Sequence, residues 1–200
     1  MSDHYYSRKP QSKSNPKTWQ YQENEKIYQF TTDDGVFSKH GIDYGTRLLI
    51  EYFKAPKING ALLDLGCGYG PIGVLLADRY PDRKVTMVDV NERALELAQK
   101  NLQDNQIDNA QVIQSDGFAN ITDRQFAAII TNPPIRAGKK VVYRLFEESK
   151  QSLLPNGELW IVIQKKQGAP SAQKKLATLF KRVDIIARQK GYFIIRALNA

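Results

Sequence analysis

The chain has 200 residues, 42% of them hydrophobic and 25% charged, with a formal net charge of +8. This composition is ordinary for a globular protein, and the length suits one well-packed domain better than two. No apolar run approaches membrane-spanning length and the N-terminus has no apolar signal segment, so we expect a cytoplasmic protein without a membrane partner. One cysteine and two distant histidines exclude an internal disulfide and give no zinc-ligand spacing, so we expect no metal.

The positive charge is concentrated in the last third of the chain. From Lys139 onward there are thirteen Lys or Arg residues against four Asp or Glu residues. Such a concentration favours a polyanionic partner, most simply nucleic acid. The alternative is a basic surface that only keeps the protein in solution.

The N-terminal residues 1–26 are polar and basic, and we expect a partly flexible extension before a domain at 27–200. Either this extension is a mobile tail or its interleaved aromatic residues contact RNA. Trp19 and Tyr21 are expected to start a short strand. Residues 27–32 are expected to continue it as a hairpin that uses 33–35, Asp-Asp-Gly, as its turn.

The rest of the chain alternates between helix and strand patterns. Asp43 is expected to cap a helix that carries its apolar residues on one face and ends before Pro56. The elements expected after it are strand 61–65, helix 72–79, strand 84–88, helix 92–105, strands 110–114 and 126–131, helix 139–152, strand 157–164, helix 171–180, and strands 183–188 and 192–198. This alternation implies a parallel sheet covered by helices on both faces.

The last two strands are joined only by residues 189–191, Gln-Lys-Gly. A parallel crossover needs a dozen or more residues, so the final strand must run antiparallel. A doubly wound sheet with a terminal antiparallel hairpin departs from the dinucleotide-binding fold.

A glycine-rich loop follows the strand at 61–65 and opens the next helix. Gly66, Gly68 and Gly70 let the backbone turn sharply and let a ligand approach without a Cβ in the way. A strand that ends in such a loop is typical of a nucleotide-type site in an open α/β sheet.

The loop fits two cofactors. Residues 68–73 match G-x-G-x-x-G, and Asp89 lies at a suitable distance for a ribose, which favours a nicotinamide or flavin enzyme. Pro71 argues against this interpretation, because a pyrophosphate rests on backbone N–H groups at the helix start and proline has none. S-adenosylmethionine has no phosphate, and Asp64 is placed to hold its cationic amino group, directly or through water.

Two further acidic residues close neighbouring strands. Asp89 is expected to accept hydrogen bonds from both ribose hydroxyls, although a cap for the helix that begins near Asn91 is the alternative. Asp116 is expected to accept from the adenine amino group, with Phe118 packed on the ring. A turn residue at Asp116 and a core residue at Phe118 are the alternatives.

The fourth strand of the sheet ends in Asn132, Pro133, Pro134 and Ile135. Here the chain resembles class I S-adenosylmethionine-dependent N-methyltransferases with an Asn-Pro-Pro motif, and among them the small-subunit ribosomal RNA guanine-N2 methyltransferases in a single-domain form. The segments that carry the resemblance are 35–38, 43–46, 64–73, 132–139, 164–169 and 191–192.

This resemblance implies a fold, a cofactor and a reaction. The fold is a seven-stranded, doubly wound, mostly parallel Rossmann-like α/β sheet with an antiparallel last strand, after a short N-terminal β extension. The reaction is methylation of an exocyclic amine, most simply guanine N2 of ribosomal RNA, whose protons the Asn132 side-chain oxygen and the Pro133 carbonyl accept. The expected cofactor contacts are Phe37, Ser38, Asp64, Gly66, Cys67, Gly68, Gly70, Asp89, Val90, Asn91, Asp116, Gly117, Phe118 and Asn132.

Ile135 departs from the family pattern. The resembling enzymes carry Phe or Tyr there, where the ring stacks on a flipped-out base, whereas isoleucine supplies only apolar contact. Just beyond it, Arg136, Lys139 and Lys140 are expected to hold phosphates of a ribosomal RNA or ribosomal particle. Their alternative is to be solvated residues that lead into a helix.

Three other functions stay open at this point. A protein-glutamine methyltransferase would use the same Asn-Pro-Pro chemistry on a side-chain amide. A nicotinamide oxidoreductase would use the glycine loop, and a non-catalytic RNA-binding module would keep only the fold.

Overall fold

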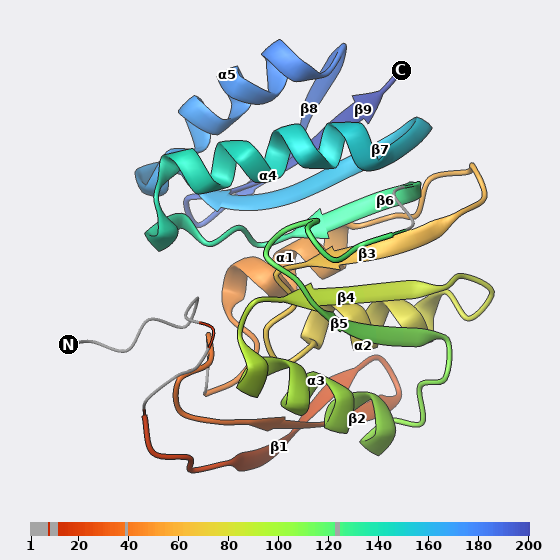
Figure 1. The fold of residues 1–200 in the computed structure, drawn as a ribbon, viewed down its shortest axis with the longest axis vertical. Helices are drawn as coiled ribbons and strands as arrows, with labels where there is room; N and C mark the ends of the chain where they lie inside the picture. Colours follow the sequence, from red (N-terminus) through yellow and green to blue (C-terminus); the bar gives the residue numbers. More distant parts are fainter. Residues whose placement is uncertain (1–7, 9–11, 39, 123–124) are drawn as a thin grey trace.

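The computed structural model describes residues 8, 12–38, 40–122 and 125–200 (Figure 1). In chain order the elements are β1 (Lys17–Glu23), β2 (Lys26–Thr32), α1 (Tyr44–Tyr52), β3 (Ala61–Leu65), α2 (Pro71–Arg79), β4 (Val85–Asp89), α3 (Glu92–Asp104), β5 (Ala110–Gln114), β6 (Phe126–Thr131), the 3-10 turn η1 (Ile135–Ala137), α4 (Lys139–Ser152), β7 (Leu153–Gln164), the 3-10 turn η2 (Lys165–Gln167), α5 (Ala169–Leu179), β8 (Arg182–Gln189) and β9 (Tyr192–Asn199).

The central sheet has seven strands in the order β5-β4-β3-β6-β7-β9-β8. Strands β5, β4, β3, β6 and β7 are parallel, and β9 lies between β7 and β8, antiparallel to both. The predicted antiparallel last strand is therefore confirmed. Residues 190–191 form the two-residue turn between β8 and β9. Since Tyr192, the first residue of β9, pairs with Gln164, the last residue of β7, this turn lies at the same sheet edge as the carboxyl ends of the parallel strands.

Helices cover both faces of the sheet. α4 and α5 lie on the near side in Figure 1, with α1 and α2 behind the sheet. Leu49, Leu75 and Ala98, from α1, α2 and α3, pack in one apolar cluster, while Phe146 of α4 and Leu176 of α5 belong to a second. Strands buried on both faces explain the nearly continuous apolar run of β6.

Most predicted elements agree with the structure to within two residues at each end, and Asp43 caps α1 by accepting from the Thr46 N–H at 3.1 Å. Strand β7 is longer than predicted, because it begins at Leu153 and shifts register against β6 after Phe126.

The hairpin of β1 and β2 has a different turn from the predicted one. Its two strands pair from Lys17–Thr32 to Glu23–Lys26, so the turn is the two residues between Glu23 and Lys26, with Asn24 at φ 55°. The prediction of a turn at 33–35 is wrong. Asparagine tolerates the left-handed backbone region that a two-residue turn requires, and this decides the position.

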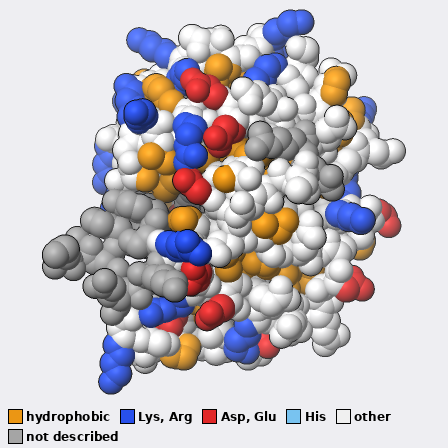
Figure 2. Space-filling model, viewed as in Figure 1, with side chains coloured by type: hydrophobic (Ala, Val, Ile, Leu, Met, Phe, Trp, Pro, Cys, Tyr) orange, Lys and Arg blue, Asp and Glu red, His pale blue; other side chains and the backbone are white. Residues whose placement is uncertain are grey.

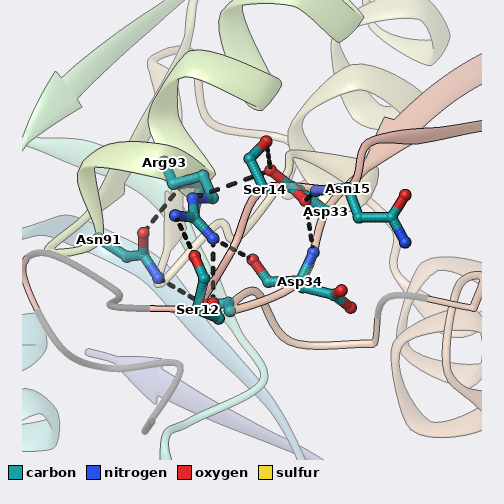
Figure 3. Close-up of polar contacts among 9 residues, drawn as sticks. Ser12, Ser14, Asn15, Asp33, Asp34, Asn91 and Arg93 are labelled. Carbon is teal, nitrogen blue, oxygen red and sulfur yellow. Dashed lines mark hydrogen bonds and ion pairs between the residues drawn. The ribbon is translucent and has the colours of Figure 1, made fainter.

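Residues 33–35 instead hold the start of α3 (Figure 3). The guanidinium of Arg93 donates to the backbone oxygens of Asp34, at 2.6 Å, and Ser12, at 2.8 Å, and it lies 3.8 Å from the Asp33 carboxylate. The Asn91 side chain donates to the Gly35 oxygen at 3.0 Å. This polar cluster fixes residues 12–15 and the segment after β2 against α3. The predicted RNA contacts before residue 8 and at 9–11 lie outside the described residues.

Candidate active site

A cavity of about 820 Å³ opens at the carboxyl ends of β3, β4 and β6. Its walls come from the segment before α1, the first turn of α1, the glycine loop, the residues after β4, β5 and β6, one face of α4, and the beginning of β9. The site thus combines residues from Val36 to Tyr192, which only the fold brings together.

The glycine loop divides into two parts with different roles. A Cβ built on Gly66 (φ 77°) or Gly68 (φ 57°) would meet no atom within 4 Å, so both leave open space on the cavity wall. A Cβ on Gly70 would lie 2.6 Å from the Met87 methyl carbon, and Gly73 is equally close to Met87. Gly70 does not line the cavity, so the cofactor contact expected there stays a prediction, and its missing Cβ allows α2 to pack on β4.

The start of α2 offers few donors for a phosphate. Pro71 occupies the first turn without an N–H, and the Gly73 N–H already donates to Asp64 Oδ2 at 2.8 Å. This arrangement argues against a pyrophosphate site, because such a site depends on free backbone donors at the helix start.

Asp64 lies beneath the glycine loop and is not part of the cavity wall. Its side chain is buried, and its Oδ1 has no hydrogen-bond partner among the described residues. Burial, together with the nearby charge of Asp89, raises the pKa of Asp64 to about 8. The predicted hold on a cationic amino group therefore remains a prediction, and the unpartnered oxygen is the feature that fits it.

Asp89 ends β4 and lines the cavity. Its two carboxylate oxygens accept from the N–H groups of Gly68, at 2.8 Å, and Asn91, at 2.9 Å. Burial raises its pKa, and these backbone hydrogen bonds oppose the rise. Each oxygen keeps a lone pair for a ribose hydroxyl. Val90 also lines the cavity, whereas Asn91 caps α3 by accepting from the Ala94 N–H and does not.

The third acidic residue is already paired. Asp116 and Gly117 line the cavity, but Arg144 of α4 donates to Asp116 at 2.5 Å and lies 3.7 Å from Glu148. The hydrogen bond and the negative charge raise the pKa of Arg144. Phe118 is 1% exposed, and its ring belongs to the core under α4. The prediction that its ring packs on the adenine is wrong, because α4 covers it, and Phe118 is the core residue that was the alternative.

The segment before α1 forms the opposite wall. Phe37 lines the cavity and is 41% exposed, which is unusual for a large apolar ring. Ser38 lines it too and donates to the Gly41 oxygen. Cys67 of the glycine loop also lines the cavity, and burial raises the pKa of its thiol.

Asn132 directly follows β6 and is held by α1. Its Nδ2 donates to the Thr46 hydroxyl at 3.0 Å, which leaves Oδ1 as the acceptor on the other arm of the amide. Pro133, Pro134 and Ile135 line the cavity beside it. The Pro133 carbonyl accepts from the Ile135 N–H at 2.8 Å and keeps a second lone pair. Asn132 and Pro133 are thus adjacent residues of the cavity wall, and each carries an acceptor oxygen.

The predicted phosphate contacts differ in position. Arg136 lines the cavity, whereas Lys139 and Lys140 are exposed at the start of α4 and do not. Lys139 lies 5.4 Å from the centre of the Tyr143 ring. Lys and Arg side chains stand on the upper left part of the face in Figure 2, over α4 and α5 of Figure 1.

Among the residues of the cavity wall to which sequence reasoning gave no role are Thr46, Arg144, Gln167 and Tyr192. Three of them lie in segments that carry the family resemblance, which was the only signal available. Arg144 lies on a helix with no motif, so only the fold reveals its pairing with Asp116.

In the part of the chain that the structure describes, no three His, Cys, Asp or Glu residues are grouped so that they could hold a metal ion. None of the described helices is both long and apolar enough to cross a membrane.

The chain matches the model of the methyltransferase small domain family over residues 27–196. It is 56% identical over 198 residues to the "Uncharacterized protein YbxB" of Bacillus subtilis, covering 98% of each chain. It is 42% identical over 132 residues to "Ribosomal RNA small subunit methyltransferase C" of Pasteurella multocida, covering 64% of this chain and 39% of that protein.

Among solved structures, the T. thermophilus 16S rRNA N2 G1207 methyltransferase in complex with AdoMet and guanosine has a TM-score of 0.82 and 24% identity. That match covers 92% of this chain and 51% of the other. At this identity the likeness shows the shared fold. The chain spans 39% to 51% of the length of these two ribosomal RNA methyltransferases.

Proposed function

The chain belongs to the methyltransferase small domain family and is an S-adenosylmethionine-dependent methyltransferase, and from this premise we propose that it methylates an exocyclic amine of RNA, specifically guanine N2 of small-subunit ribosomal RNA. Family membership leaves no role for the nicotinamide interpretation of the glycine loop. The observation that carries the proposal is Asn132 at the cavity wall, where its Nδ2 donates to Thr46 and its Oδ1 stays available as an acceptor.

The residues of the cavity suit this cofactor. Gly66 and Gly68 leave a cradle that a Cβ would fill, Asp89 has lone pairs for two hydroxyls, and Asp64 has an unpartnered oxygen beneath the loop. When bound, the cofactor supplies an electrophilic methyl group on a sulfonium.

The chain's own residues would act on the nucleophile. The lone pair of an exocyclic amine is delocalised into the base, so the amine is weakly nucleophilic. Asn132 Oδ1 and the Pro133 carbonyl would accept its two protons and turn the lone pair toward the methyl group. The nitrogen would then take the methyl group that the cofactor supplies, and its surplus proton would pass to water. Since both acceptors are neutral and fixed, their contribution is orientational and electrostatic.

The choice of RNA has two supports. The last third of the chain is strongly basic, and two of the three proteins named above act, by their names, on small-subunit ribosomal RNA. Arg136 at the cavity, with Lys139 and Lys140 beside it, would hold phosphates next to the target nucleotide.

The test is transfer of a labelled methyl group. We expect the full chain to label unmodified small-subunit RNA or subunits, with the label recovered as N2-methylguanosine after digestion to nucleosides. Label in the protein fraction would instead favour the glutamine methyltransferase. A folded protein that binds the cofactor and labels neither would contradict the proposal and favour a non-catalytic RNA-binding module.

Asn132→Ala tests the catalytic role directly. We expect turnover to fall by at least about 100-fold, since both orientation and charge stabilisation at the amine are lost. Cofactor affinity, measured by titration calorimetry, should change by less than about threefold. Unchanged turnover would refute the assigned role of Asn132.

A further inference from the structure

Tyr192 brings an aromatic ring into the acceptor side of the cavity. It is the first residue of β9, it is half-buried, and it lines the cavity. A Cβ on Gly45 would lie 2.7 Å from the Tyr192 Cε1 atom, so the ring rests directly on the backbone of α1. The Tyr44 ring lies beside it, with ring centres 5.5 Å apart. These neighbours fix the ring in place.

The same turn of α1 that supports this ring also holds the amide at the reaction site. Gly45 lies beneath Tyr192, and the next residue, Thr46, accepts from Asn132. The ring and the amide therefore have a common support. Ile135 and Tyr192 line the same cavity, and Tyr192 brings to it an aromatic ring that Ile135 does not supply.

Two cationic side chains lie against the Tyr44 ring, which is outside the cavity wall. The Lys190 ammonium lies 4.8 Å from the centre of the Tyr44 ring, and the Arg47 guanidinium lies 6.0 Å from it. Both cations are exposed, and neither forms an ion pair within the described ranges. Other cations of the protein are paired, such as Arg79, whose guanidinium lies 3.0 Å from the Glu23 carboxylate.

Lys190 occupies a backbone position that lysine seldom takes. Its φ is +46°, followed by +80° at Gly191, as a two-residue hairpin turn requires. Asparagine or glycine would fit this turn with less strain. Residues in such unfavourable backbone conformations are concentrated at functional sites. A binding function therefore explains why a lysine, with its charge beside an aromatic ring, occupies this position.

We propose that the first turn of α1 and the β8–β9 turn bind the RNA strand at the reaction site, with Tyr192 stacking on the acceptor base and the Tyr44–Arg47–Lys190 cluster holding the adjoining nucleotide. This inference rests on the proposed function, because it assigns the contacts of the same substrate. Stacking on an aromatic ring is tolerant of sequence, and the two cations are suited to a phosphate.

Tyr192→Leu tests the stacking contact. Loss of one base–aromatic stack corresponds to a decrease of about 5- to 150-fold in kcat/KM for RNA. Cofactor affinity should stay within about threefold, and Tyr192→Phe, which keeps the ring, should retain most of the activity. Adding Ile135→Phe to Tyr192→Leu should restore part of kcat/KM, since it returns a ring to the acceptor side. A purely structural Tyr192 would show no such restoration.

Gly45→Ala provides a second variant that keeps the helix. Alanine has a better helix propensity than glycine, so α1 should form, but the new Cβ displaces the Tyr192 ring. We expect a loss of kcat/KM comparable to that of Tyr192→Leu, with a cooperative thermal transition retained. Wild-type kcat/KM in both Tyr192→Leu and Gly45→Ala would overturn the stacking assignment.

Lys190→Asn tests the cationic cluster. Asparagine suits the turn, so the fold is kept while one charge is lost. The slope of log K for RNA against log salt should become shallower by about 0.7, as for one fewer phosphate contact on a single strand. The control is Lys84→Gln, an exposed lysine at the opposite sheet edge, just before β4. An equal slope in the wild type and Lys190→Asn would overturn this part of the inference.

These outcomes separate the two levels of the hypothesis. Absence of RNA methylation by the wild-type protein contradicts the proposed function. Methylation by the wild type, with no loss in the Tyr192, Gly45 and Lys190 variants, contradicts only the strand-binding inference.

Discussion

At the scale of single residues, the hydroxyl of Thr46 decides which atom of Asn132 faces the acceptor. The hydroxyl accepts from Asn132 Nδ2 and is itself buried, so the amide has little freedom to rotate. We expect Thr46→Val, which keeps the shape but removes the acceptor, to lower kcat on the order of 10- to 100-fold, because an amide that turns misplaces its oxygen. Single-turnover methyl transfer measures this directly.

Thr46→Ser is the matched control for that substitution. It keeps the hydroxyl and should retain kcat within about threefold of the wild type, while cofactor affinity stays the same in both variants. Equal rates for Thr46→Val and the wild type would mean that another contact orients Asn132.

The carboxyl group of Asp64 predicts an unusual pH dependence of stability. Its folded-state pKa is raised to about 8, mainly by burial, while an unfolded aspartate ionises near pH 4. Between these values the folded state holds one proton more than the unfolded state, so this group's contribution to stability is complete below pH 4 and is lost as the pH rises toward 8. Asp64→Asn, which cannot ionise, should lack this loss.

Urea unfolding of both proteins at pH 5 and pH 8 measures this contribution. The stability of Asp64→Asn relative to the wild type should increase from pH 5 to pH 8, and the asparagine oxygen can still accept from the Gly73 N–H. A difference that does not change with pH would refute a raised pKa in the folded protein.

At the residue scale, the sequence indicated the position of side chains at strand ends correctly, although the roles assigned to them stay predictions. Asp89 and Asn132 line the cavity because they lie at strand ends, which a one-dimensional pattern marks. Phe118 and Asn91 were predicted to contact the cofactor, but neither lines the cavity. Phe118 is buried under α4 and Asn91 caps α3, and both arrangements depend on contacts that the sequence pattern does not contain. Tyr192 could not be assigned a role, because its support, Gly45, lies far away in the sequence.

At the scale of elements, the hairpin is attached to α3 by two asparagines one helical turn apart. Asn101 accepts from the Thr31 N–H at 2.7 Å and donates to the oxygens of Thr31 and Tyr69, so its amide pairs with the free edge of β2. Asn105 makes the equivalent pair with Gln29. These side chains satisfy backbone groups that an edge strand would otherwise leave unpaired.

We expect Asn101→Ala to destabilise the protein by about 3 kcal/mol, because the buried polar groups of Thr31 and Tyr69 lose their partner. Asn105→Ala, at a site reached by water, should cost about 1 kcal/mol. Urea unfolding monitored by circular dichroism compares the two. Equal losses would mean that burial does not distinguish the two asparagines.

Element boundaries were predictable because hydrophobic periodicity and caps are local signals. β5 and β6 were predicted with the residues that the structure gives them, and Asp43 was identified as the cap of α1. The hairpin turn was misplaced because Asp-Asp-Gly at 33–35 is a stronger turn signal than the residues around Asn24. Its polar groups serve the Arg93 cluster instead, a long-range contact that no local signal marks.

At the scale of the whole molecule, strand order determines what the site contains. The order β5-β4-β3-β6 puts Asp89, the glycine loop and Asn132 on neighbouring strand ends, so a cofactor and an acceptor can meet there. Because β9 pairs with β7, the β8–β9 turn lies at the same edge of the sheet, and it brings Tyr192 and Lys190 to the side of the molecule that carries the site. The alternation of helix and strand patterns predicted the parallel sheet, and the short connection between the last two strands predicted the antiparallel strand. No local signal indicated that α4 and the beginning of β9 contribute to the cavity wall.

The boundary proposed at residue 26 divides the hairpin, and it can be tested by truncation. We propose that residues 27–200 form the methyltransferase domain, which agrees with the range of the family model. Without β1, however, Phe30 and Tyr69 lose the Trp19 ring, whose centre lies 5.4 and 6.3 Å from theirs. We expect the 27–200 fragment to unfold cooperatively, with a Tm at least about 5 °C below that of the full chain.

Trp19→Leu in the full chain is the control, because it removes the ring but keeps the pairing of β1 with β2. This substitution should lower the Tm by less than the truncation does. S-adenosylmethionine should raise the Tm of the fragment as well as that of the full chain, since the cavity wall described above begins at Val36. A fragment without a cooperative transition would show that the domain includes β1, and the boundary would then have to precede Lys17.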